Sequence, residues 1–140
     1  MISLVKLIMG LKGSGKTKKL IELLRIAEEI ETGDIVCIER AEKLRYDVPY
    51  KVRLINASEY DFNGYDFLKG FISGVYSANY DITHIFIDSV LKIIGAPYDE
   101  RADNFLALCE EFSKRENVKF TISVSADVTL ATENSKKYFL

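Results

Sequence analysis

The sequence predicts an α/β fold with a mostly parallel central sheet and helices on both faces. Short apolar runs of strand length alternate along the chain with longer segments whose apolar residues recur at helical spacing. One of the short runs, THIFIDS at residues 83–89, is an uninterrupted run of mainly β-branched and aromatic residues, which is typical of strands buried on both faces. The segments between the short runs are long enough to hold the helical crossovers that join parallel strands.

Composition and charge narrow the class of protein. A length of 140 residues suits a single domain covering 1–140, and no repeat or low-complexity linker marks a boundary. The formal net charge of −2 gives no strong nucleic-acid signal. No apolar run reaches the roughly 20 residues of a membrane span. The first apolar run contains Lys6 and leads into a lysine-rich segment, unlike a signal peptide, so we expect a cytoplasmic protein.

The first third of the chain is predicted to form a strand, a helix and a second strand. Residues 2–9 are a continuous apolar run, and residues 34–40 (DIVCIER) are another. Between them, residues 16–31 have helical periodicity, with Gly33 expected as the C-cap. The apolar face of this helix comprises Leu20, Leu23, Leu24, Ala27 and Ile30.

The alternation continues to the end of the chain. Helices are expected over residues 65–79 and 102–115, and residues 95–104 (GAPYDERADN) are expected to form a loop. The helical faces comprise Leu68, Phe71, Ile72, Val75 and Tyr76 in the first, and Phe105, Leu108, Cys109 and Phe112 in the second. Strands are expected at 51–57 (KVRLINA), 83–89 (THIFIDS) and 118–125 (VKFTISVS), with a short last one at 136–140 (KKYFL).

The cysteines argue against a zinc site. Cys37 and Cys109 lie far apart in apolar surroundings, and neither belongs to a Cys-x-x-Cys pair. The single histidine is His84, so a four-ligand zinc site is not expected. Both cysteines are predicted to be buried free thiols.

A glycine-rich stretch follows the first predicted strand and matches the pattern G-x-x-x-x-G-K-[ST]. Glycines let successive backbone N–H groups converge on one point, and the helix that follows adds the positive end of its dipole. A lysine here can reach terminal phosphates, and a threonine can offer its hydroxyl to Mg²⁺. The stretch therefore predicts a nucleoside triphosphate site formed by Gly10, Leu11, Lys12, Gly13, Ser14, Gly15, Lys16 and Thr17.

Asp88 ends the apolar run HIFID, and a carboxylate there would be costly without a cation or hydrogen-bond donors nearby. The carboxyl ends of parallel strands share one edge of the sheet, which is also where the glycine-rich stretch lies. We therefore expect Asp88 near the Mg²⁺ ion. A helix N-cap formed by Asp88 or Ser89 is the structural alternative, and both roles can coexist.

GLKGSGKT and IFID together resemble the Walker A and Walker B motifs of the P-loop NTPase superfamily. The resemblance implies a three-layer P-loop NTPase fold that binds ATP, with Thr17 and Asp88 on the Mg²⁺ ion. More than one helix and more than one strand lie between the two motifs, as in the branch of the superfamily whose Walker strands are separated by another strand. TISVS would be that strand, which makes Ser123 or Ser125 either a polar sensor near the phosphates or an ordinary strand-end residue.

The resemblance leaves the catalytic base open. Many hydrolysing members of this branch have a glutamate directly after the Walker B aspartate, where this sequence has Ser89. Either hydrolysis is weak, or the base comes from elsewhere. Recombinase-like ATPases carry it at the end of the strand after the P-loop helix, which corresponds to Glu39 and Glu42 here. Both glutamates can equally be solvated loop charges.

A weaker similarity is to thymidine kinase-like nucleoside kinases, which also begin with a strand, SGKT and a helix, and have a segment similar to EKLRYD after the second strand. The cysteine-bound zinc of that family and the glutamate after its Walker B aspartate are both missing.

The arginines on or near loops are candidates for contacts to phosphate or across a subunit interface, or are surface charges. They are Arg40, Arg45, Arg53 and Arg101.

Three functions follow as expectations. The first is a small Mg²⁺-dependent ATPase of low intrinsic activity, acting through a protein partner or as a homo-oligomer. The second is a thymidine kinase-like phosphotransferase that acts on a nucleoside. The third is a non-catalytic nucleotide sensor whose loops rearrange on binding.

Overall fold

The computed structural model of the chain describes residues 4–40, 44–45 and 47–140, and it confirms the α/β class. Five strands form one sheet in the order β1-β5-β4-β2-β3, and every neighbouring pair is parallel. The strands are β1 (Val5–Gly10), β2 (Asp34–Glu39), β3 (Arg53–Asn56), β4 (Ile82–Ile87) and β5 (Lys119–Ser125). The helices are α1 (Lys16–Ile30), α2 (Gly64–Ala78), α3 (Val90–Ile94), α4 (Glu100–Glu116) and α5 (Glu133–Lys136).

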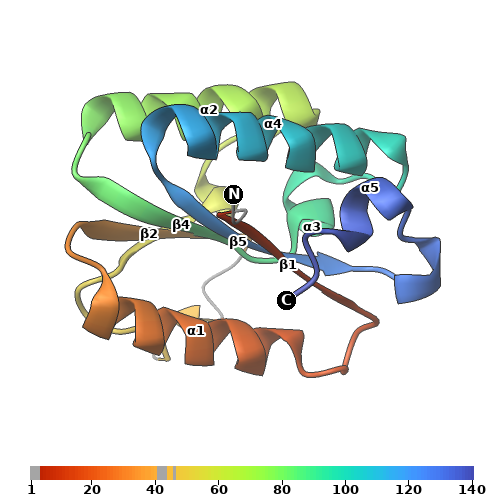
Figure 1. The fold of residues 1–140 in the computed structure, drawn as a ribbon, viewed down its shortest axis with the longest axis horizontal. Coiled ribbons are helices and arrows are strands. Elements are labelled where there is room, and N and C mark those ends of the chain that lie inside the picture. Colours follow the sequence, from red (N-terminus) through yellow and green to blue (C-terminus); the bar gives the residue numbers. More distant parts are fainter. Residues whose placement is uncertain (1–3, 41–43, 46) are drawn as a thin grey trace.

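Helices cover both faces of the sheet, with α1 on one side and α2 and α4 on the other (Figure 1). Two apolar clusters fill the spaces between these layers. On the α1 side, Leu20 and Leu24 pack with Cys37 and Phe86 of the sheet. The cluster on the other side is larger and joins α2 and α4 to residues such as Ile85. Both faces of the central strands are thus buried, which explains their uninterrupted apolar sequences.

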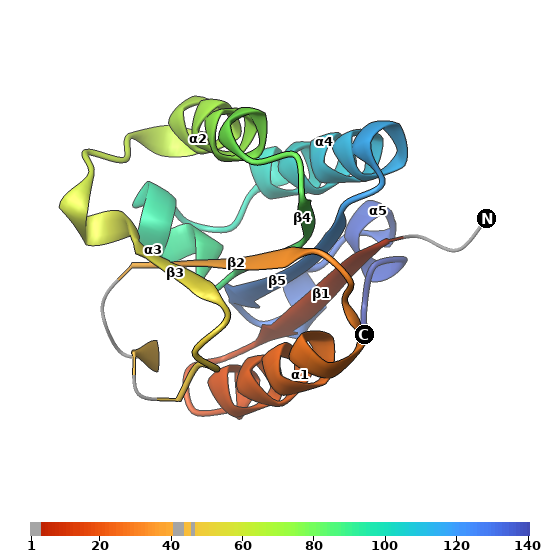
Figure 2. The same ribbon diagram turned by 90° about the vertical axis from the view of Figure 1, so that its left-hand side faces the viewer.

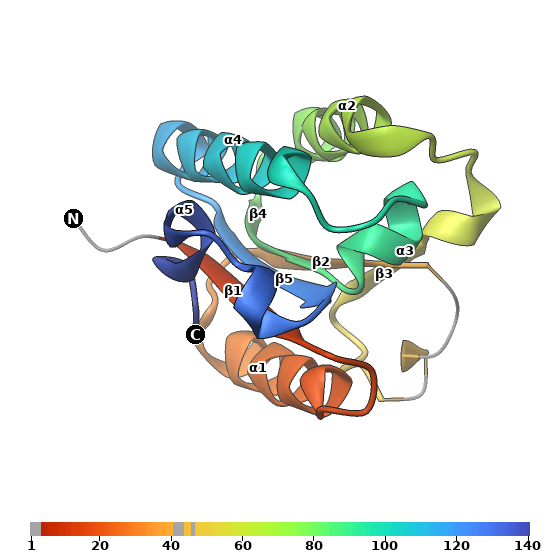
Figure 3. The ribbon, with the colours of Figure 1, turned by 90° about the vertical axis from the view of Figure 1, so that its right-hand side faces the viewer.

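Strand β5 lies between β1 and β4, as the predicted separation of the two motif strands requires. Gly10 at the end of β1 is in register with Ser125, and Ile87 at the end of β4 is in register with Ile122. All strands are parallel, so their carboxyl ends form one edge. Figure 3 shows this edge, with α3 on one side of the strand ends and the start of α1 on the other.

The end of α1 differs from the prediction. The helix ends at Ile30, and the N–H of Glu31 at the C-cap donates to the Ala27 carbonyl oxygen at 2.8 Å, so Gly33 is not the cap. Gly33 instead passes against the start of the β4 segment, where a Cβ would collide with the Asp81 carbonyl oxygen. Ile30 does not join the buried face, since 62% of it is exposed.

The expected last strand at 136–140 is wrong. Its first residue belongs to α5, and the segment makes only one isolated bridge to the sheet, between Leu7 and Phe139. The Leu7 N–H donates to the Tyr138 carbonyl oxygen at 2.7 Å, and the Leu140 N–H donates to the Leu7 carbonyl oxygen at 3.1 Å. These contacts cover the outer side of β1 without forming a sixth strand.

The segment after β4 is more helical than predicted. Helix α3 begins where the alternative of an N-cap at Asp88 or Ser89 placed a helix, although its five residues are too few for periodicity to reveal. The loop predicted at 95–104 ends early, since α4 begins at Glu100. The Asp99 carboxylate caps this helix by accepting from the Arg101 N–H at 2.9 Å.

Among the described residues, no helix combines the length and apolar character needed to span a bilayer. Cys37 and Cys109 are buried free thiols, as predicted. Burial raises the pKa of both thiols, so they stay neutral at ordinary pH.

His84 is half-buried on β4, in surroundings that favour its neutral form. Its ring stacks on Phe86 with 4.1 Å between the ring centroids, and its Nε2 lies 2.9 Å from Thr121 Oγ1. Its Nδ1 is buried and has no hydrogen-bond partner among the residues that the structure describes, and the nearby Glu31 carboxylate pairs more closely with Lys119, at 2.6 Å. Burial lowers the pKa of His84 from 6.5 to about 4, against the opposing attraction of Glu31.

A pH-dependent stability follows from this shift. Because the pKa of His84 is lower in the folded state, stability is full above pH 6.5 and is lost as the pH falls toward 4. Between pH 7.5 and pH 5, the wild type should lose about 2 kcal/mol more of its free energy of unfolding than His84→Gln, which cannot be protonated. Urea unfolding at both pH values measures this, and equal losses would contradict a neutral His84.

Candidate functional site

The glycine loop, residues 10–17, is a tight turn that leads directly into α1. Gly13 and Gly15 have φ values of 86° and 89°, which residues with a side chain rarely adopt. The Ser14 N–H closes the turn by donating to the Leu11 carbonyl oxygen at 3.1 Å. Helix α1 then begins at Lys16, with Gly15 at its N-cap. The loop therefore sits at a helix N-terminus, where free N–H groups and the helix dipole favour an anion.

Lys16 folds back over this loop. Its side-chain Nζ donates to the Leu11 carbonyl oxygen at 2.8 Å, and only 9% of the residue is exposed. Partial burial lowers the pKa of Lys16, the Asp88 carboxylate opposes this shift, and Lys92 adds to it. A cation therefore lies beside the helix N-terminus, within electrostatic reach of the carboxylate at the end of β4.

Asp88 is buried directly after β4 and is held from two sides. Its N–H donates to the Ile38 carbonyl oxygen of β2 at 2.8 Å, and the Ser123 hydroxyl donates to its Oδ1 at 2.8 Å. The Ser123 oxygen in turn accepts from the Ser89 N–H at 2.7 Å. Ser123, completely buried on β5, thus orients the carboxylate. The N-cap alternative applies to Ser89, which occupies the N-cap position of α3 but makes no side-chain capping bond.

Glu39 is the last residue of β2 and lies beside Asp88. The hydrogen bond from the Asp88 N–H to Ile38 joins the two strand ends one residue before Glu39. Both carboxylates raise the pKa of the Cys37 thiol beneath them, after the larger effect of burial. Only 2% of Glu39 is exposed, and its carboxylate accepts from the Leu44 N–H at 3.2 and 3.3 Å. Glu39 is therefore a buried carboxylate, not a solvated loop charge; Glu42 lies outside the described residues.

Ser89 has a left-handed backbone, with φ 57° and ψ 60°. This conformation is uncommon for a residue with a side chain and costs about 1 kcal/mol. It turns the chain sharply from β4 into α3, and the bond from the Ser89 N–H to Ser123 holds the turn. The residue directly after Asp88 is thus a strained serine.

Lys92 was not among the sequence candidates. It lies on α3, and its charge lowers the pKa of Lys16, so the two ammonium groups are close enough to interact. It also lines a cavity of about 260 Å³ together with Arg40, which follows Glu39. The only available signal was its position four residues after Asp88, and that carries meaning only once a helix is known to begin at Val90.

Of the remaining predicted site residues, some lie at this edge of the sheet and others lie elsewhere. Ser125 is half-buried opposite Gly10, and the next residue donates its N–H to the Gly10 carbonyl oxygen at 3.1 Å. Arg101 pairs with Asp99, with 2.7 Å between Nη2 and Oδ2. Arg45 and Arg53 line a cavity at β3, on the margin of the sheet opposite β1 (Figure 2).

The oxygen groups at this edge suit Mg²⁺. Thr17, exposed in the first turn of α1, and Asp88 offer a hydroxyl and a carboxylate, which are hard ligands. Mg²⁺ usually keeps several waters and binds through one or two carboxylates together with phosphate oxygens, so two protein groups are sufficient. A site made by the protein alone is not found, since no group of three or more His, Cys, Asp or Glu side chains gathers within the described ranges.

The chemistry of these residues carries the functional argument by itself. No protein-family model and no curated protein matches the chain.

Proposed function

We propose that the protein is a P-loop NTPase that binds ATP with Mg²⁺ and hydrolyses it slowly. The observation that carries this proposal is the meeting of Lys16, Asp88 and Glu39 at one edge of the sheet. They come from three separate segments, and each is largely buried although its side chain is ionisable. Buried charges are costly unless they are compensated, and a nucleotide–metal complex beside the glycine loop supplies that compensation.

The glycine loop and Lys16 would bind the phosphates. A triphosphate replaces the Leu11 carbonyl oxygen as the acceptor for Lys16 Nζ, a bond now 2.8 Å long. A charge-assisted bond to phosphate is stronger than this neutral one, so the exchange favours binding. Thr17 and Asp88 would hold Mg²⁺, which, when bound, neutralises charge on the phosphate oxygens.

Glu39 would orient the water that attacks the terminal phosphate. It is the carboxylate beside Asp88, whereas Ser89 cannot accept a proton with comparable strength. The bond from the Leu44 N–H occupies part of the Glu39 carboxylate and restrains it. This restraint is our reason for expecting turnover well below the roughly 1–10³ per second of typical enzymes.

Single-turnover measurements with radiolabelled ATP and Mg²⁺ test the proposal. Slow release of phosphate that requires Mg²⁺ is the expected result. Tight binding without phosphate release would favour the nucleotide sensor instead. Absence of ATP binding would refute the proposal.

A phosphotransferase is the second candidate, favoured by the cavity of about 260 Å³ that is lined by Arg40, the residue after Glu39. Arg40 and Lys92 give it cationic walls, and Asp61 gives it a carboxylate. An acceptor bound there would lie next to the proposed phosphate site. Transfer of label to one of a panel of nucleosides, in place of release to water, would establish this function.

Asp88→Asn should separate metal binding from phosphate binding. The change keeps the size of the side chain but removes its charge, so the gain in ATP affinity on adding Mg²⁺ should fall at least about tenfold. Affinity without Mg²⁺ should stay the same or improve, because repulsion of the phosphates is lost. Calorimetric titration with and without Mg²⁺ measures both, and equal weakening in the two conditions would make Asp88 structural.

A further inference from the structure

Strand β3 forms an open margin of the sheet. Within the described residues it pairs only with β2, whereas the outer side of β1 is covered by the segment around Phe139. Every second residue of an edge strand directs its N–H and C=O away from the sheet. The margin at β3 therefore presents backbone groups that another extended chain can pair with.

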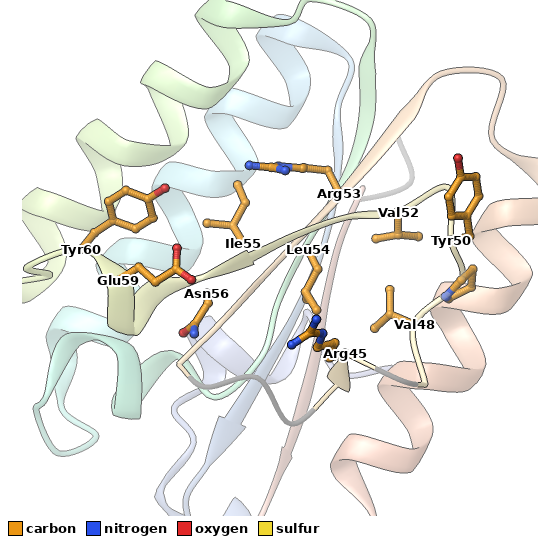
Figure 4. A pocket seen from close by; sticks show the side chains of 11 residues that line it. Arg45, Val48, Tyr50, Val52, Arg53, Leu54, Ile55, Asn56, Glu59 and Tyr60 are labelled. Atoms are coloured by element: carbon orange, nitrogen blue, oxygen red, sulfur yellow. The ribbon is translucent and has the colours of Figure 1, made fainter.

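A cavity of about 380 Å³ runs along this margin. Five consecutive residues, 52–56, line it, so it follows the strand itself and not one face of the sheet. Figure 4 shows Arg53 and Ile55 on one side of β3 and Leu54 and Arg45 on the other. The packing agrees, because Ile55 belongs to the core cluster under α2, while Leu54 packs against the cluster on the α1 side. A strand added here would direct its alternating side chains toward both sets.

The charges that line the cavity indicate which kind of ligand it prefers. Of the described residues that line it, two are arginines and one is a glutamate, so the charge of these lining residues is net positive. Arg53 is exposed and makes no ion pair with another described residue. Tyr60 lies on the same side as Arg53, and the fully exposed Tyr50 stands at the other end of the cavity (Figure 4). A carboxylate can take bonds from a guanidinium and a phenol together.

We propose that β3 binds an extended acidic peptide segment of a partner protein, which adds to the sheet as a sixth strand. Backbone bonds to β3 supply affinity that depends little on sequence, and side-chain contacts supply selection. Neighbouring residues of the added strand point to opposite faces, so two adjacent acidic residues reach the Arg53 side and the Arg45 side. This proposal does not depend on nucleotide binding.

Fluorescence anisotropy with a labelled peptide, Ser-Val-Asp-Glu-Val-Thr, tests the proposal. Binding with a Kd on the order of 10 to 100 µM is expected. Arg53→Glu should weaken it at least about tenfold, and so should replacing Asp-Glu in the peptide by Asn-Gln. Lys51→Glu is the matched control, because it makes the same charge change just before the same strand, does not line the cavity, and should alter affinity less than about twofold.

Backbone methylation of the peptide tests the strand pairing. Methyl groups on the alternate amides that face β3 should abolish binding, whereas methyl groups on the amides that face away from β3 should leave it unchanged. Equal binding of both methylated peptides, or of the Asp-Glu dipeptide alone, would mean a site for small anions and would overturn the proposal. Absence of binding at about 1 mM peptide would also overturn it. Sedimentation tests the alternative occupant. A wild-type dimer that dissociates in Arg53→Glu would identify the occupant as a second copy of the chain and would overturn the proposal of an acidic peptide.

Discussion

Lys16→Ala is expected to lower the affinity for ATP–Mg²⁺ about 100-fold while the protein stays folded. The ammonium group would lie next to the terminal phosphates, and charge-assisted bonds of this kind contribute about 1.5–3 kcal/mol. The fold should tolerate the change, because the bond that is lost joins Lys16 to a carbonyl oxygen in an exposed loop that water can reach. Calorimetric titration gives the affinity, and thermal unfolding gives the stability.

Lys12→Ala is the matched control for this experiment. Lys12 belongs to the same glycine loop and carries the same charge, but its side chain is exposed. Its removal should cost less than about fivefold in affinity, and that loss should shrink at high salt. Unchanged affinity in Lys16→Ala, or equal loss in the two variants, would show that the loop does not hold phosphate as proposed.

Glu39→Gln is expected to reduce ATP hydrolysis at least about 100-fold and to leave ATP binding nearly unchanged. The amide can still accept from the Leu44 N–H, so the local structure is kept, but it cannot withdraw a proton from water. Loss of a general base typically costs 10²–10⁴ in rate. Single-turnover hydrolysis and a binding titration of the same variant separate the two effects.

Two further variants interpret that result. Ser89→Glu should change the rate little if Glu39 is already the base, and should raise it if the base is missing. Glu28→Gln removes the same charge in the last turn of α1, far from the carboxyl ends of the strands. This variant should hydrolyse ATP like the wild type. Hydrolysis that survives in Glu39→Gln would contradict the role given to Glu39.

The sequence predicted most of the sheet because its central strands are buried on both faces. Uninterrupted runs such as IVCI and HIFI have few alternatives in a chain of this length, and the order of motifs placed β5 between β1 and β4. Prediction was poorest where tertiary contacts decide the outcome. Gly33 resembled a helix cap, but the reason for a glycine there is the close approach of Asp81, which lies far away in the sequence.

The candidate site likewise contains residues that local patterns predicted and residues that only tertiary contacts reveal. The glycine loop and Asp88 belong to local patterns and were found directly. Choosing Glu39 as a buried group required the hydrogen bond between Asp88 and Ile38, which joins two strands that are not neighbours in sequence. The bond from Ser123 to Asp88 and the effect of Lys92 on Lys16 also depend on such long-range placement.

The position of β5 has a consequence for how the chain acquires its structure during synthesis. Strand β1 emerges from the ribosome before the other strands of this sheet, but its only strand neighbour among the described residues is β5, which pairs Val5 with Phe120. Until β5 has been made, β1 and the glycine loop have no sheet to join, and the facing side of β4 remains an open edge. Such non-local pairings form slowly, and exposed apolar edges aggregate. The nascent chain is therefore expected to expose these two strand edges until β5 inserts between them.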